Sequence, residues 1–153
     1  MTILVFSDSH GTKNGMLDAV QLESPSLILH LGDNIRDCAI ITTAFPEIPL
    51  RPVKGNCDYG LAGLDMDEFV FGGKRFFMTH GHLFGVKTGK ASVINAATYR
   101  AADVLLFGHT HIPYYSVLEN LTIVNPGSIG SVDRQYAVLE IKNGAILCEL
   151  KRL

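Results

Sequence analysis

Side chains that can bind metal ions gather in five short segments of the chain, each directly after an apolar run. One such residue at the end of a strand is ordinary, but five segments that combine carboxylate, imidazole and amide groups favour a shared site. His, Asp and Asn are ligands that suit divalent transition ions. The sequence therefore predicts a metal centre built from Asp8-Ser9-His10, Gly32-Asp33-Asn34, Gly55-Asn56-Cys57-Asp58, His80-Gly81-His82 and Gly108-His109-Thr110-His111.

Several of these segments also have a simpler explanation when each is taken alone. Asp8 could form an Asx turn, with His10 as an ordinary surface residue. Asp33 could cap a helix that begins near Arg36. Asn56 after a glycine could be plain turn chemistry. It is the joint pattern that favours the metal centre over these separate readings.

The histidines carry the strongest signal. Five of the six lie in these segments, and only His30, inside an apolar strand, is predicted to be a core or edge residue. His109 and His111 flank one residue, and in an extended segment side chains at this spacing point to the same side. His80 and His82 share that spacing, so both pairs could face one centre.

The apolar runs before these segments predict the strands that position them, at residues 2–6, 27–31, 50–54, 75–79 and 104–107. Ligands of an open sheet of parallel strands bind outside the carboxyl ends of the strands. If these five strands run side by side, all five segments meet at one edge.

The remaining patterns predict the other elements. Helices are expected at 13–22 and 36–45, and this alternation predicts a parallel sheet with right-handed crossovers. A hairpin is expected around Gly72-Gly73 and an alanine-rich helix at 90–102. The last four strands look like a β meander, at 114–118, 122–124, 136–141 and 145–150. The expected architecture is two packed sheets with helices outside.

Composition narrows the class of protein. A chain of 153 residues that is 47% apolar and 18% charged fits one globular domain over 1–153. A net charge of −2 gives no basic surface for stable nucleic-acid binding, although a nucleotide substrate stays open. No window reaches the about 18 apolar residues of a membrane span, and no signal peptide is apparent. Three scattered cysteines fit reduced thiols, so a cytoplasmic protein is expected.

Such a ligand set suits phosphoester chemistry. Two divalent ions about 3.5–4 Å apart can hold a phosphate, orient an attacking hydroxide and stabilise the leaving oxygen. Two ions, the Asp8 and Asp33 carboxylates and a bridging hydroxide leave a net charge of about +1, which attracts phosphate. Mixed nitrogen and oxygen ligation favours Mn²⁺, Fe, Co²⁺, Ni²⁺ or Zn²⁺ over Ca²⁺.

The order Asp-x-His, Gly-Asp, Gly-Asn, His-Gly-His, Gly-His-x-His resembles the calcineurin-like metallophosphoesterase family. The later segment Asn125-Pro126-Gly127-Ser128 and the short chain resemble its small prokaryotic phosphodiesterase branch. The resemblance implies an α/β fold, a four-layer αββα sandwich of two mixed β-sheets flanked by helices. It also implies that Asp33 bridges two ions, that Asp8, His10 and His111 complete the first ligand set, and that Asn56, His80 and His109 complete the second.

The resemblance further implies a catalytic group formed by Asp33, Asn56, His82, Cys57 and Asp58. His82 is expected to orient a ligand or touch substrate. Cys57 is a departure, because many family members carry a histidine there that contacts phosphate and helps to protonate the leaving group. A thiol with a pKa of about 8.5 is a poor replacement for a cationic imidazole. Asp58 is expected to be a charge partner or a turn residue.

These observations predict a two-metal phosphodiesterase that cleaves a small phosphodiester by attack of a metal-bridging hydroxide. Mn²⁺ is the first expectation for the metal. Specificity is expected from loops 58–67 and 83–90. The alternative is a weak or inactive protein-binding scaffold like the retromer scaffold subunit, whose ligand set is incomplete. The retention of His10, Asp33 and Asn56 favours catalysis; no membrane partner is expected, and self-association is left open.

Overall fold

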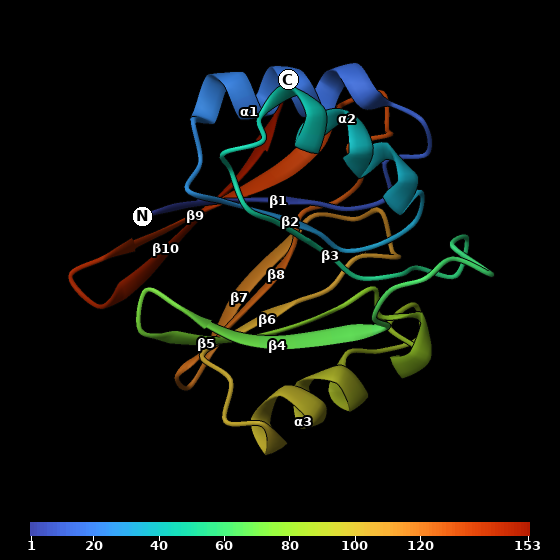
Figure 1. The fold of residues 1–153 in the computed structure, drawn as a ribbon. Coiled ribbons are helices and arrows are strands. Elements are labelled where there is room, and N and C mark those ends of the chain that lie inside the picture. The colour runs from blue at the N-terminus through green and yellow to red at the C-terminus, as the bar shows by residue number, and fades with distance from the viewer.

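A computed structural model describes residues 1–153 and shows two β-sheets packed face to face, with helices on both outer surfaces (Figure 1). Helices α1 (Lys13–Glu23) and α2 (Cys38–Ala44) cover one sheet, and α3 (Ala91–Tyr99) covers the other. The predicted four-layer αββα sandwich is confirmed. None of its helices has the length and apolar character needed to cross a membrane.

The first sheet has the strand order β10-β9-β1-β2-β3. Strands β1, β2 and β3 are parallel, and β9 runs antiparallel to β1. The short 3₁₀ turn η1 (Ile35–Asp37) precedes α2, so the helix expected from residue 36 starts as a tighter turn. The strands are β1 (Thr2–Phe6), β2 (Leu27–His30), β3 (Leu50–Pro52), β9 (Gln135–Lys142) and β10 (Ala145–Arg152).

The second sheet has the order β4-β5-β6-β8-β7. Strands β5, β6 and β8 are parallel, whereas β4 and β7 are antiparallel edge strands. The 3₁₀ turn η2 (His82–Phe84) follows β5. The strands are β4 (Met66–Phe71), β5 (Lys74–Thr79), β6 (Val104–Leu106), β7 (Tyr114–Leu118) and β8 (Leu121–Asn125).

The main core lies between the two sheets. Val5 and Leu29 of the first sheet are fully buried in one cluster with Phe76 and Leu106 of the second. Both faces of β1 are buried, because its other face packs against Met16 of α1 and its neighbours. A strand buried on both faces reads as a continuous apolar run, which is the pattern of residues 2–6. This rigid core fixes the loops that follow β1, β2, β3, β5 and β6.

One topological prediction is wrong, and one assumed arrangement of strands is not found. The last four strands do not form a meander, because the hairpin β7–β8 belongs to the second sheet and the hairpin β9–β10 to the first. The five strands before the polar segments also do not share one sheet, since β1, β2 and β3 lie in the first and β5 and β6 in the second. Alternation of polar and apolar residues predicts a strand but does not say which sheet it joins.

Candidate metal centre

The polar segments meet nevertheless, because the two sheets present the carboxyl ends of these strands on the same side. Within the first sheet, the Asp8 N–H donates to the Gly32 carbonyl at 2.9 Å. Within the second, the Gly108 N–H donates to the His80 carbonyl at 3.0 Å. The two sheets are joined where the His80 ring bonds the Leu31 carbonyl at 2.7 Å. The predicted meeting of the segments therefore holds, across two sheets rather than along one.

Two glycines allow this close approach. Gly32 has a positive φ of 102°, and a Cβ there would lie 2.5 Å from the Gly55 nitrogen and 2.9 Å from His80 Nδ1. A Cβ on Gly55 would collide with the Asp33 carboxylate and would lie 2.5 Å from the Asp33 nitrogen. Any other residue at these positions would push Asp33 and His80 out of place.

Several candidate ligands sit on left-handed backbone. Non-glycine residues rarely adopt positive φ, and such strain concentrates at functional sites. The idea that His109 and His111 share a side because their segment is extended is wrong, since both are in left-handed turns. The positive φ values are 55° for Asp8, 44° for His10, 62° for Asp33, 66° for His109 and 58° for His111.

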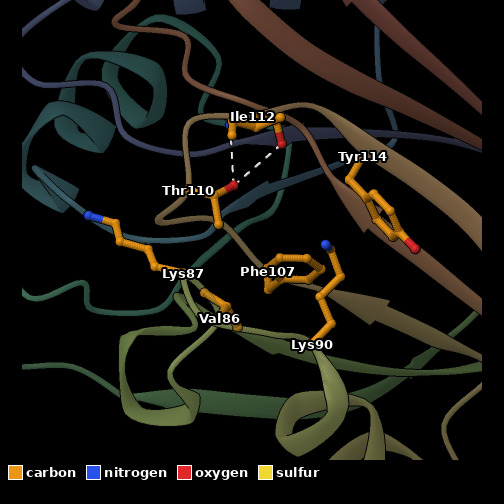
Figure 2. Close-up of a pocket in the computed structure, with 7 residues that line it drawn as sticks. All are labelled: Val86, Lys87, Lys90, Phe107, Thr110, Ile112 and Tyr114. Carbon is orange, nitrogen blue, oxygen red and sulfur yellow. Dashed lines mark hydrogen bonds between the residues drawn. The ribbon is translucent and has the colours of Figure 1, made fainter.

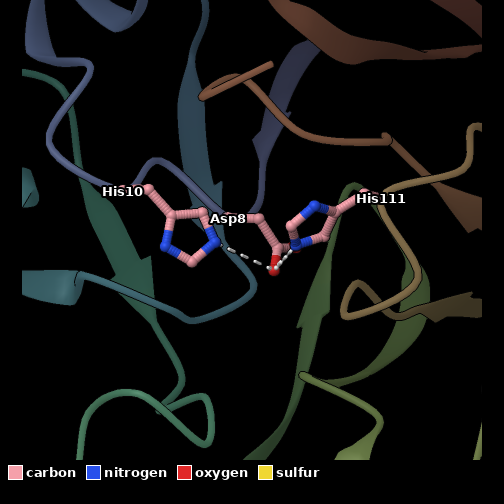
Figure 3. Close-up of side chains that lie close together, drawn as sticks. All are labelled: Asp8, His10 and His111. Atoms are coloured by element: carbon pink, nitrogen blue, oxygen red, sulfur yellow. Dashed lines mark ion pairs between the residues drawn. The ribbon is translucent and has the colours of Figure 1, made fainter.

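Asp8, His10 and His111 form the first part of the site (Figure 3). Asp8 is fully buried, and its Oδ1 lies 2.9 Å from His111 Nε2 and 3.9 Å from His10 Nε2. The other oxygen, Oδ2, accepts hydrogen bonds from the Ser7 hydroxyl and from the His109 N–H. Oδ1 makes no hydrogen bond of good geometry and faces only imidazole nitrogens. A buried carboxylate oxygen left in this state is costly unless something positive faces it.

His80, Asn56 and His109 form the second part. The His80 Nδ1–H donates to the Leu31 carbonyl, so in the neutral ring Nε2 presents its lone pair. That Nε2 lies 3.1 Å from Asn56 Oδ1 and 3.1 Å from His109 Nδ1. The Asn56 amide nitrogen contacts the Cys57 sulfur at 3.6 Å, which leaves its oxygen facing His80. A histidine fixed by a backbone carbonyl is typical of metal ligands.

Asp33 lies between the two parts. Its Oδ2 is 3.5 Å from His80 Nε2 and 4.0 Å from His10 Nε2. Its Oδ1 accepts the Cys57 N–H at 2.8 Å. Burial opposes ionisation of Asp33, but the Cys57 N–H and the charge of His80 outweigh it, and the pKa of the carboxyl is lowered. Asp33 is therefore an anion that faces both parts of the site.

The donor set fits divalent cations. Ligand atoms lie within 4.8 Å of one another in three overlapping groups, Asp8 with His10 and His111, His10 with Asp33 and Cys57, and Asp8 with Asp33 and His80. Burial, then His80 and Lys87, lowers the pKa of His109 to about 4, so its ring is neutral, as metal ligation requires. Carboxylate, imidazole and amide donors that converge in this way suit a divalent cation.

His82 lies beside this set and belongs to none of the three groups. Its ring centroid is 5.4 Å from that of His80 and 6.1 Å from that of His109. Its Nδ1 is buried and has no hydrogen-bond partner. The structure thus brings His82 next to the candidate ligands His80 and His109.

Cys57 and Asp58 differ sharply in their surroundings. Cys57 is exposed, although partial desolvation of its sulfur and the adjacent Asp33 raise the pKa of the thiol. The Cys57 sulfur lies in one of the three groups of candidate donors, with His10 and Asp33. Asp58 is buried, and its carboxylate accepts the N–H groups of Asp33 at 2.9 Å, Gly55 at 2.8 Å and Ile35 at 3.0 Å. It fixes the turns and does not face the centre.

A second polar network behind the site was missed by sequence reasoning. His30 is buried as predicted, and its Nδ1 accepts the Gly32 N–H at 3.2 Å while its Nε2–H donates to Ser9 Oγ at 3.2 Å. Ser9 in turn donates to Asp37 Oδ2 at 2.8 Å. The network ties the loop after β1 to the loop after β2. No sequence signal marked Asp37, because its partner Ser9 lies far away along the chain.

We expect His30 to make folding depend on pH. Burial lowers the pKa of His30 to about 4 from its ordinary 6.5, against the opposing charges of Asp8, Asp58 and Asp37. Between pH 4 and pH 6.5 the unfolded chain binds a proton that the folded chain does not. The free energy of unfolding is therefore at its full value above pH 6.5 and decreases as the pH falls below it. The loss should reach about 3 kcal/mol near pH 4.

Urea unfolding of the metal-free protein between pH 4 and 7.5 measures this slope. The His30→Gln variant keeps a hydrogen-bonding side chain that does not titrate in this range, so its profile should be shallower. Equal slopes in the two proteins would contradict the assignment of the proton to His30.

Comparison with known proteins agrees with this geometry. Residues 1–144 match the calcineurin-like phosphoesterase superfamily domain. The probable metallophosphoesterase YsnB of Bacillus subtilis is 36% identical over 154 aligned positions, which cover 95% of this chain and 87% of that protein. A predicted phosphoesterase of known structure from Streptococcus pneumoniae superposes with a TM-score of 0.81 at 25% identity, over 99% of this chain and 88% of the other.

One further solved structure shares the fold. Vps29 of Entamoeba histolytica, complexed with zinc, superposes with a TM-score of 0.76 at 20% identity, over 99% of each chain. At that identity the likeness concerns the fold alone. The domain match and the similarity to YsnB cover nearly the whole chain, and the domain match includes all five polar segments. The chain therefore belongs to the small prokaryotic calcineurin-like phosphoesterases and is a metal-dependent phosphoesterase.

Proposed function

We propose that this protein is a phosphodiesterase that works with two divalent ions held on either side of Asp33. The observation that carries the proposal is the position of Asp33 Oδ2, which faces His80 at 3.5 Å and His10 at 4.0 Å. A carboxylate between two sets of nitrogen and oxygen donors suits a shared ligand. Asp8, His10 and His111 would complete one site, and Asn56, His80 and His109 the other.

Bound there, the ions would polarise the phosphoryl oxygens and supply a nucleophile at neutral pH. The chain's own residues hold the geometry. The Leu31 carbonyl fixes the His80 ring, the Cys57 N–H fixes Asp33, and the Ser7 hydroxyl fixes Asp8. Mixed nitrogen and oxygen donors support Mn²⁺ first, with Ni²⁺, Fe, Co²⁺ or Zn²⁺ as alternatives.

The surroundings support a diester as substrate. One cavity, of about 560 Å³, includes Asn56 and His82 in its lining. Another, of about 390 Å³, includes Thr110, between the candidate ligands His109 and His111. Two cavities beside one centre suit a phosphorus atom that carries two organic groups. They are lined in part by the loops 58–67 and 83–90, from which specificity was expected.

Cellular location is a separate part of the proposal. The cysteines at 38, 57 and 148 are all free, and Cys57 is exposed. Exposed free thiols persist in a reducing compartment, which supports a cytoplasmic enzyme.

The test begins with protein stripped by a chelator and then reloaded with each candidate ion. Hydrolysis of bis(p-nitrophenyl) phosphate, p-nitrophenyl phosphate and cyclic nucleotides is measured together with bound metal. We expect no turnover without metal, restoration by Mn²⁺, and faster hydrolysis of the diester than of the monoester. Tight metal binding without turnover of any ester would instead support a protein-binding scaffold.

Cys57 should limit the enzyme to good leaving groups. General acid catalysis by a positioned side chain contributes about 10²–10⁴-fold, and it matters most for poor leaving groups. The thiol has a raised pKa and donates hydrogen bonds only weakly. We therefore expect fast hydrolysis of aryl esters with acidic leaving groups and slow hydrolysis of alkyl esters.

The dependence of rate on leaving-group pKa measures this effect. Cys57→His should raise the rate on poor leaving groups more than on good ones. If Cys57→Ala abolishes turnover while metal binding is intact, Cys57 protonates the leaving group after all, and the prediction is wrong.

A further inference from the structure

The cavity of about 390 Å³ beside Thr110 has a lining that the metal chemistry does not use (Figure 2). We infer that this cavity holds one ester arm of the substrate, and that this arm carries an apolar ring and a second anionic group. The inference rests on the proposed phosphodiesterase function and names the class of diester. The lining residues are Val86, Lys87, Lys90, Phe107, Thr110, Ile112 and Tyr114.

The floor of the cavity is apolar. Phe107 and Val86 are buried, whereas Ile112 at the rim is 67% exposed. The Phe107 and Tyr114 rings lie 6.5 Å apart, tilted by 50°. A concave apolar surface with a few polar groups is typical of a small-molecule site. Its ring-lined floor suits a ring on the ligand.

The cavity adjoins the candidate metal centre. Thr110 lies between His109 and His111, and its hydroxyl is held by the Asn125 amide at 3.0 Å and by the Ile112 N–H at 3.2 Å. On the other wall, Val86 packs against Gly81, where an added Cβ would lie 2.8 Å from Val86 Cγ2. Both walls are therefore continuous with loops that carry candidate ligands. A group bound in the cavity can be bonded to the phosphorus at the centre.

The charge of the cavity favours an anionic arm. Figure 2 places Lys87 and Lys90 on either side of Val86, with the Lys90 ammonium directed toward the Phe107 and Tyr114 rings. Lys90 Nζ lies 4.4 Å from the Tyr114 ring centroid. Neither lysine forms an ion pair with a carboxylate in the structure.

The other cavity differs in charge. Its lysine, Lys54, is neutralised by Asp65 at 3.4 Å, and both residues line that cavity. Of these two cavities, the one beside Thr110 therefore combines unpaired lysines with an apolar floor. An aryl carboxylate arm and a phosphorylated nucleoside arm share the chemistry that this surface would recognise.

The experiment uses the metal-loaded enzyme, with p-nitrophenyl methyl phosphate as the reporter substrate. Dimethyl phosphate, diphenyl phosphate and bis(4-carboxyphenyl) phosphate are added as slowly hydrolysed competitors. The symmetrical diesters place the same group in the cavity whichever arm enters it. We expect diphenyl phosphate to inhibit more tightly than dimethyl phosphate. The two carboxylates should add a further factor of about three to ten, as expected for contacts with exposed lysines.

Substitutions locate the effect. The double variant Lys87→Ala/Lys90→Ala should lose the gain from the carboxylates, and Ile112→Asp should weaken both aryl competitors. Lys74→Ala, at the distant β4–β5 hairpin, is the matched control and should keep the gain. A dinucleotide with and without a 5′-phosphate, tested in the same variants, shows whether a nucleotide arm is preferred over an aryl carboxylate.

The outcomes separate this inference from the proposed function. If the reporter is not hydrolysed with any ion, the phosphodiesterase function fails. If it is hydrolysed but the carboxylates give no gain, or Lys54→Ala removes the gain instead, the assignment of the cavity is wrong. Methyl NMR signals of Val86 and Ile112 should shift when bis(4-carboxyphenyl) phosphate is added, a readout that does not depend on turnover. Shifts confined to Leu61 and Ala62 would overturn the assignment.

Discussion

Among replacements of a single residue by an uncharged one, Asp33→Asn should cause the largest loss of activity in this protein. Asp33 Oδ2 faces both His80 and His10, so the amide would weaken both proposed ion sites at once. The substitution also removes one of the few negative charges that offset two divalent ions. We expect a loss greater than about 100-fold, the upper end for residues that only orient a ligand, and a clear fall in bound metal.

The control is Asp18→Asn, which removes the same charge on the surface of α1, where Asp18 pairs with Arg134 at 3.9 Å. Metal content by elemental analysis and turnover of bis(p-nitrophenyl) phosphate are measured for both variants. The Asp18 variant should behave like the native enzyme. Near-normal turnover and metal content in the Asp33 variant would show that Asp33 is not shared between two ions.

The strands and the polar segments after them were predictable because both leave local marks in the sequence. A run such as Ile3 to Phe6, buried on both faces, is continuous and apolar, and Asp8 interrupts it at once. The local sequence pattern does not show which sheet a strand joins. The meander was predicted because the hairpins β7–β8 and β9–β10 follow one another along the chain, yet the chain crosses between sheets after Asn125.

The internal geometry of the site was also beyond local patterns. His109 and His111 reach it through left-handed turns, which sequence periodicity does not report for non-glycine residues. The network of His30, Ser9 and Asp37 depends on contacts between residues far apart in the chain. Lys87 and Lys90 lie in the loop 83–90 from which specificity was expected, but two lysines in a loop do not show the charge of a ligand until the cavity beside them is seen.

The distinction between His80 and His82 is the sharpest test of the proposed ligand set. His80 is fully buried, its Nδ1–H is fixed by the Leu31 carbonyl, and its Nε2 faces Asn56, His109 and Asp33. His82 is only half-buried and belongs to none of the groups of converging donors. His80→Ala should therefore lower bound metal from about two ions per chain toward one, whereas His82→Ala should leave about two.

The two variants should also differ in kinetics. His82→Ala should change kcat or KM with metal content intact, because the residue lines the cavity beside Asn56. Since His80 is buried, His80→Gln is a second variant that fills more of the space, and circular dichroism shows whether each variant is folded. A folded His80 variant with full metal content, or a His82 variant that loses an ion, would reverse the assignment. The ligand would then be the histidine in the 3₁₀ turn, and His80 would serve to hold the two sheets together through Leu31.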